Sequence, residues 1–273
     1  MRFDWYAATI ARHPMEVVGT LRREFGAEVR QTHGLHGYTQ GFDLVGPHGT
    51  MAKVLAGGAN GNPHAWASGE DTERFVQLVR SEWPLEHTVS RMDSAEDFQG
   101  PGSWDRLNAE CLEVADRLRL KVSQAGDYHR LEDGRTLYVG SRKAAVFIRL
   151  YEKGKQLRAK VTQGAELIPA DWCRLEAQVR PQKEARKAAA FVTPEQAWGF
   201  AGWTHDLALR CMALDVPRVQ MNVWRESDDE RAFAFMVRQY GHMLERLRRD
   251  LGDWQCVGLQ IGDAVADLWR ERS

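Results

Sequence analysis

The sequence predicts a mixed α+β protein whose last third is mainly helical. Segments with the alternation typical of strands are interleaved with amphipathic helical segments over roughly the first 180 residues. From residue 183 onward, helix-forming residues dominate. With 273 residues, of which 43% are hydrophobic, the chain is long enough to bury a sizeable core.

Hydrophobic periodicity assigns the elements of the first part of the chain. Glycines between residues 34 and 49 indicate a meander of short strands, whereas the Gly- and Asn-rich segment 57–63 is expected to be a loop. In chain order, we expect a strand at 3–10, a helix at 14–25, strands near 38–45 and 51–55, a helix at 70–83, a strand at 87–98 and a helix at 104–122.

Further strands follow, and the pattern changes to helices after Pro181. We expect strands at 135–139, 145–151 and 172–179, separated by glycines and a proline. The helices that follow are expected at 183–190, 194–212, 232–251 and 257–269. We therefore divide the chain into a core, residues 1–190, and a helical C-terminal region, residues 191–273.

Composition argues against several classes of protein. The first residues lack a charged segment followed by an apolar one, and no run approaches the roughly 20 apolar residues that span a bilayer. We therefore expect a cytoplasmic protein without a membrane partner. The four cysteines are far apart and form no Cys-x-x-Cys pair, so neither a zinc knuckle nor a disulfide scaffold is indicated.

Charge is concentrated in one window of the chain. The whole chain has a formal net charge of -1, which does not favour contact with phosphates. Residues 141–190, however, contain twelve Lys and Arg against five Asp and Glu. A solvated surface explains most basic runs, but a nucleic-acid site is the alternative. Ten tryptophans are present, and an exposed one such as Trp66 or Trp104 could stack on DNA bases.

Two carboxylates share one face of the strand predicted at 87–98. Alternation places Arg91, Asp93 and Asp97 on the same side. Paired carboxylates on a rigid strand suit a hard divalent cation such as Mg²⁺ or Mn²⁺. The alternative is that Arg91 pairs with one of these acids on a solvated face.

A tyrosine surrounded by cations lies in the basic window. If the strand continues, Phe147, Arg149, Tyr151, Lys153 and Lys155 share a face. A tyrosine nucleophile must form a phenolate, which its ordinary pKa of about 10 disfavours, so nearby cations or a metal must stabilise the anion. The alternative is a half-buried strand tyrosine whose hydroxyl meets water.

A third strand can complete the site. In residues 173–180, alternation places Arg174, Glu176, Gln178 and Arg180 on one face, so a third carboxylate can join the first two. An ordinary surface pair of Arg and Glu is again the alternative. Before the tyrosine, Arg142 and Lys143 follow Gly140 in a turn suited to a phosphate backbone.

Taken in order, these motifs resemble a known family. The chain has Arg-x-Asp-x-x-x-Asp-Phe, then Tyr-Val-Gly-Ser-Arg-Lys, Ile-Arg-Leu-Tyr-Glu-Lys-Gly and Arg-Leu-Glu. This order resembles the replication initiation factors of rolling-circle plasmids, filamentous phages and integrative elements, over roughly residues 3–190. The resemblance implies a fold related to the His-hydrophobe-His endonucleases, with paired strand-helix-strand units and an antiparallel sheet, but with acids in place of the histidine pair.

The resemblance also implies roles for individual residues. Tyr151 would be the nucleophile, with Arg149 and Lys153 as catalytic cations. The metal, Mg²⁺ or Mn²⁺, would be held by Asp93, Asp97 and Glu176, and DNA would be bound by Arg142, Lys143, Lys155, Arg174 and Arg180. Two positions depart from the family pattern, since Glu152 follows the tyrosine where Asn or Asp is usual, and Ala144 replaces a serine.

The function implied is initiation of rolling-circle replication. Such an enzyme nicks one DNA strand, forms a 5′-phosphotyrosine bond and rejoins strands later. Expected partners are single-stranded or hairpin origin DNA, a host helicase and a second copy of the chain. Two alternatives stay open at this point, a relaxase of a conjugative or integrative element and a non-catalytic DNA-binding regulator on the same scaffold.

Overall fold

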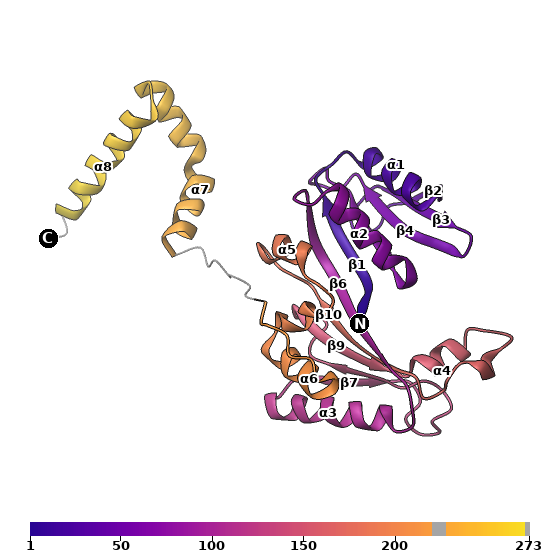
Figure 1. Ribbon diagram of the computed structural model, residues 1–273. Helices are drawn as coiled ribbons and strands as arrows, with labels where there is room; N and C mark the ends of the chain where they lie inside the picture. Colours follow the sequence, from indigo (N-terminus) through magenta and orange to yellow (C-terminus); the bar gives the residue numbers. More distant parts are fainter. Residues whose placement is uncertain (220–227, 271–273) are drawn as a thin grey trace. The chain divides into compact units, whose positions relative to one another are not determined.

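A computed structural model describes residues 1–219 and 228–270, and its main feature is one ten-stranded sheet (Figure 1). Every pair of neighbouring strands is antiparallel, and the strand order is β2-β3-β4-β5-β1-β6-β10-β9-β8-β7. The strands are β1 (Arg2–Ile10), β2 (Glu28–His33), β3 (Gln40–Gly46), β4 (Gly49–Ala56), β5 (His64–Ser68), β6 (His87–Phe98), β7 (Val122–Ala125), β8 (Thr136–Val139), β9 (Val146–Tyr151) and β10 (Cys173–Val179).

The two halves of the sheet repeat one topology. In the first half, β1 leads into helix α1 (Pro14–Phe25), and the meander β2 to β5 returns to pair with β1. In the second half, β6 leads into helix α3 (Ser103–Leu118), and β7 to β10 return to pair with β6. Strands β1 and β6 are therefore adjacent at the centre of the sheet. This arrangement confirms the predicted α+β class with paired units and an antiparallel sheet.

Helices cover one face of this sheet. Helix α1 and helix α2 (Thr72–Glu82) pack on the first half, and α3 and α6 (Gly202–Met212) pack on the second. Their apolar stripes bury against alternate strand residues such as Met92, Ile148 and Leu175, and this burial is the main stabilising contribution. The short helix α5 (Ala185–Ala188) lies near β6, and 3-10 turns occupy Gly69–Asp71, Ala165–Leu167, Ala189–Phe191 and Gln196–Phe200.

Several elements differ from the sequence prediction. Helix α3 ends at Leu118, because Arg119 adopts a left-handed conformation, and residues 122–125 form a strand instead of more helix. The edge strand β2 was not predicted, since all six of its side chains are exposed and it has no buried face to set a pattern. Strand β9 ends at Tyr151, as predicted, and helix α4 (Lys153–Arg158) follows it, so the alternation considered for Lys153 and Lys155 does not continue.

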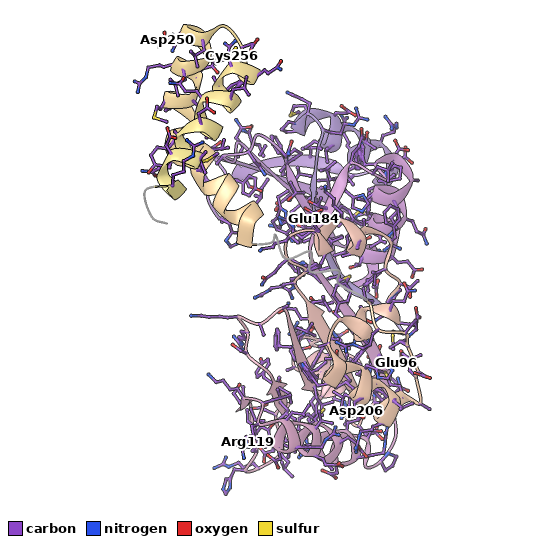
Figure 2. All side chains as sticks on the ribbon, turned by 90° about the vertical axis from the view of Figure 1, so that its left-hand side faces the viewer. Glu96, Arg119, Glu184, Asp206, Asp250 and Cys256 are labelled. Carbon is purple, nitrogen blue, oxygen red and sulfur yellow. The ribbon has the colours of Figure 1, made fainter. Side chains whose placement is uncertain are left out.

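By internal contacts, the chain divides into two compact units, Met1–Asn222 and Val223–Ser273. Helix α6 belongs to the first unit, where Arg117 of α3 donates to Asp206 of α6, labelled in Figure 2. The second unit contains helices α7 (Asp228–Leu251) and α8 (Trp254–Arg270). The division predicted from the sequence, a core of residues 1–190 and a helical region of residues 191–273, stays a prediction. Among the described residues, no helix is long and apolar enough to span a membrane.

Candidate active site

The face of the sheet opposite the helices carries the polar residues singled out from the sequence. Met92, Ile148, Leu150 and Leu175 point into the core, so their chain neighbours point the other way. We call this second face the open face. It carries the side chains of Arg91, Asp93, Asp97, Arg149, Tyr151, Arg174, Glu176 and Gln178.

Strand register brings these side chains into rows. Asp93 of β6 is opposite Gln178 of β10, and Asp97 is opposite Arg174. On the other side of β10, Arg174 is opposite Tyr151 of β9, and Glu176 is opposite Arg149. Glu176 is thus diagonal to Asp93 and next to the row of the tyrosine. Three strands distant in sequence assemble one polar site.

Tyr151 is buried and its ring is enclosed by cations. The guanidinium of Arg149 lies 4.5 Å from the ring centroid, and the ammonium of Lys153 lies 5.7 Å from it. Both cations therefore face the ring. No partner for its hydroxyl is found among the hydrogen bonds of the described residues.

The phenol of Tyr151 is a weak acid in this environment. Burial raises its pKa to about 12, and the charge of Glu176 adds to the effect. The charges of Arg174 and Arg149 act in the opposite direction but do not compensate. Burial therefore outweighs the stabilisation that Arg174 and Arg149 offer the phenolate, and a further positive charge near the phenol would favour the anion.

Asp93 and Glu176 form a pair of buried carboxylates. Asp93 accepts hydrogen bonds from Arg91 Nε at 2.8 Å and from Gln178 Nε2 at 3.2 and 3.3 Å. Glu176 accepts one from Arg149 Nη2 at 2.7 Å. Burial and the negative charge of Asp93 raise the pKa of Glu176 above its ordinary value. The repulsion between the two negative charges would be relieved by a proton or by a nearby cation.

Asp97 has a different environment from the other two predicted metal ligands. Its two carboxylate oxygens accept from Arg174 at 2.7 and 2.8 Å, and Trp172 Nε1 donates to one of them at 2.8 Å. These hydrogen bonds hold its pKa below the ordinary range, although burial opposes them. Within residues 1–219 and 228–270, no group of three or more His, Cys, Asp or Glu is arranged to hold a metal.

Arg174 is a buried structural cation. Only 1% of its surface is exposed, whereas we expected it to contact DNA. Its guanidinium donates to Asp97 and also to Asp4 Oδ1, at 2.7 Å. These ion pairs link β10 to β6 and β1. A phosphate could reach Arg174 only after these pairs separate.

Replacing Arg174 should therefore destabilise the fold. We expect Arg174→Met to lower the free energy of unfolding by about 3 kcal/mol, because Asp4 and Asp97 would lose a shared buried partner. Urea denaturation followed by circular dichroism measures this change. Arg180→Met, next to the same strand but exposed, is the matched control and should be close to neutral. Equal stabilities of the two variants would contradict the assigned role.

Asp4 is a site residue that the sequence analysis did not find. The strand predicted at 3–10 alternates, but a register irregularity between Phe3 and Trp5 changes which side chains share a face. Asp4 is close enough to raise the pKa values of both Tyr151 and Glu176. Its side chain is 19% exposed. Nothing in the local pattern distinguishes it from other strand acids.

Three of the predicted DNA-binding cations gather at one end of the second half. Arg142 and Lys143 lie in the exposed turn between β8 and β9, and Arg180 donates to the backbone oxygen of Arg142 at 2.7 Å. Lys155 is elsewhere, because it lies in α4 and its ammonium binds Leu131 O at 2.6 Å and Glu152 at 3.2 Å.

The turn after Tyr151 explains why Lys153 and Lys155 separate. Gly154, in the first turn of α4, lies so close to the neighbouring loop that a Cβ atom would lie 1.8 Å from Pro169 O. Only glycine fits this approach. The chain leaves the sheet here, so Lys153 remains near the tyrosine while Lys155 turns toward Glu152.

The fold has a known counterpart among rolling-circle initiators. The chain is similar to the structure of the rolling circle replication initiator protein from Geobacillus stearothermophilus, with a TM-score of 0.50 and 19% identity over 72% of this chain and 82% of that one. At this identity, the similarity shows the fold alone.

Part of the chain also matches the model of a protein family. The model described as replication initiation factor matches residues 87–201, from the start of β6 to the residue before α6. The matched segment contains Asp93, Tyr151 and Glu176, and it confirms the family resemblance that the ordered motifs indicated. No curated protein matches the chain.

Proposed function

We propose that this protein initiates rolling-circle replication by nicking one DNA strand at Tyr151. The observation that carries the proposal is the position of Tyr151 on the open face, one strand from Glu176 and two from Asp93, within the segment that matches the family model. Arg142, Lys143 and Arg180 would contact the backbone of origin DNA, single-stranded or in a hairpin. Arg149 and Lys153 would hold the phosphate near the tyrosine.

The residues present fit a divalent metal. Mg²⁺ is commonly held by one or two carboxylates together with substrate phosphates, so a complete set of three protein ligands is not required. Asp93 and Glu176 supply buried oxygen ligands whose mutual repulsion a cation would relieve. Asp97, held on both oxygens by Arg174, is better suited to positioning that arginine. A bound Mg²⁺ or Mn²⁺ would supply Lewis-acid polarisation of the scissile phosphate.

The chemical step is a transesterification. The Tyr151 oxygen attacks phosphorus, a phosphorus–oxygen bond to tyrosine forms and the bond to the 3′ oxygen breaks. The phenolic proton is released and the 3′ oxygen takes up a proton, so no external energy source is needed. The products are a 5′-phosphotyrosine and a 3′-hydroxyl, which can prime synthesis and later reverse the reaction.

Trapping the covalent product tests the proposal directly. The protein is incubated with labelled single-stranded DNA from the intergenic regions of its own replicon, with Mn²⁺, and resolved on a denaturing gel. Peptide mapping of the shifted band should locate the nucleotide on Tyr151. A nick without an adduct, or an adduct on another residue, would refute the proposed nucleophile.

Metal binding should depend on pH through Glu176. The pKa of Glu176 in the folded protein is raised above its ordinary value of 4.5. Protonated Glu176 therefore contributes to the stability of the fold below pH 4.5, and this contribution is lost as pH rises through the raised pKa. A metal that needs the ionised carboxylate should bind up to about tenfold more tightly per pH unit in this window. Calorimetric titration with Mn²⁺ between acidic and neutral pH measures this dependence. Glu176→Gln should flatten it, and an unchanged slope in that variant would exclude Glu176.

A non-catalytic DNA-binding regulator is the second candidate function. It is favoured by the ion pairs, since Asp93, Asp97 and Glu176 each accept from an arginine, and by the raised pKa of Tyr151. This candidate predicts origin binding without metal and without a nick. The covalent trapping experiment separates the two, whereas a relaxase would give the same adduct and differ only in the DNA it recognises.

A further inference from the structure

A row of four aromatic rings crosses the first half of the open face. Tyr38 stacks on His64 with ring centroids 6.1 Å apart, His64 lies 5.8 Å from Trp66, and Trp66 stacks on Trp5 at 6.1 Å. All four side chains are half-buried. We call these residues the aromatic row.

Core packing does not account for this row. The neighbours Ala65, Ala67 and Tyr6 point into the apolar core on the helix side. None of the four rings belongs to either apolar cluster formed by the described residues. Gly58 leaves room for Tyr38, because a Cβ atom at Gly58 would lie 2.6 Å from that ring. Large, half-buried aromatic side chains outside the apolar core indicate a binding surface.

Cations lie beside the row at two places. The guanidinium of Arg91 lies 4.5 Å from the centroid of the Trp5 ring and also donates to Asp93, so one side chain connects the row to the carboxylate site. Arg186 donates to Thr9 Oγ1 at 3.3 Å and to Val89 O at 3.2 Å. Its charge, together with burial as the larger cause, lowers the pKa of His64 to about 4, so the imidazole is neutral at pH 7.

We propose that the aromatic row binds bases of single-stranded DNA a few nucleotides from the nick. Aromatic rings beside cations are the general means of holding unpaired bases and their phosphates. Strands β1 and β5 lie three and four strand spacings from β9, which is about 14 to 19 Å from the strand of Tyr151. Duplex DNA would not bind in this way, because its bases are stacked on one another and offer no free face to the rings. The inference rests on the proposed function, since it assigns DNA to the same face.

Replacement of one ring tests the row. The probe is a fluorescently labelled oligothymidine of about 15 nucleotides, and affinity is measured by anisotropy. Trp66→Leu should weaken binding by roughly 5- to 100-fold, the range for loss of one stacked base, while Trp66→Phe keeps most of the affinity. Trp254→Leu, an exposed tryptophan of the second unit, is the matched control and should bind like the unmodified protein.

Abasic substitution identifies the stacked base. One base at a time is removed from the probe. The unmodified protein should bind the abasic probe more weakly than the intact probe when the missing base is at one or two particular positions. At those positions, Trp66→Leu should bind the abasic and the intact probe equally. If Trp66→Leu does not fold, the same comparison is made with Trp66→Phe, which should show a smaller loss at those positions. Uniform loss at every position, or unchanged affinity in Trp66→Leu, would overturn the inference.

The inference and the nicking proposal can fail separately. Position-dependent binding without any covalent adduct would support the aromatic row as a DNA-binding site and refute the nicking proposal. An adduct on Tyr151 together with unchanged binding by Trp66→Leu would do the reverse.

Discussion

Tyr151→Phe is expected to abolish the covalent protein–DNA adduct and to lower nicking by at least about 10³-fold, because the variant lacks the attacking oxygen. The fold should be unaffected, since the ring remains and no hydrogen bond of this hydroxyl is found among the described residues. The measurement is the adduct and nicked product on a denaturing gel with Mn²⁺, with thermal unfolding as the check of folding.

Tyr138→Phe is the matched control for this substitution. Tyr138 is on β8, opposite Arg149 and on the same face as Tyr151, but it lies beyond the site, beside Phe147 and Arg142. It should retain nicking. If Tyr151→Phe still forms the adduct, or if both variants lose it equally, Tyr151 is not the nucleophile.

Asp93→Asn should lower the rate of metal-dependent nicking by about 10²- to 10³-fold, whereas DNA binding is retained. An amide keeps the shape of the side chain but is a poor ligand for a hard cation. The basic turn containing Arg142 and Lys143 is untouched, so affinity for DNA, measured by anisotropy without metal, should stay the same. Nicking is measured as a titration with Mn²⁺.

Two variants of β6 serve as comparisons for Asp93→Asn. Glu96→Gln changes an acid that pairs with the amino terminus at 2.6 Å on the other side of the strand and should nick normally. Asp97→Asn should lower stability through Arg174 yet keep the Mn²⁺ midpoint. A shifted midpoint in Asp97→Asn would restore Asp97 to the metal site, and normal nicking by Asp93→Asn would remove Asp93 from it.

Local pattern was sufficient for most elements that have one strongly apolar face. The strand predicted at 87–98 and the helix predicted at 14–25 match β6 and α1 at both ends. In α1, Pro14 at the start and Gly26 just after the end are residue types that favour these helix boundaries, and Gly26 adopts a φ of 61°. Strand β2 lacks such a face, and β5 is only five residues long, so neither was predicted.

Alternation and the order of the motifs are properties of the chain, so the fold class and the positions of Asp93, Tyr151 and Glu176 on strands were predictable before the structure was known. Which charged side chains form ion pairs depends on the three-dimensional arrangement of the strands. Arg174 pairs with Asp97, 77 residues away, and with Asp4, 170 residues away, and both contacts follow from strand register. Burial then raises the pKa of Tyr151 to about 12, since desolvation depends on everything packed around the phenol.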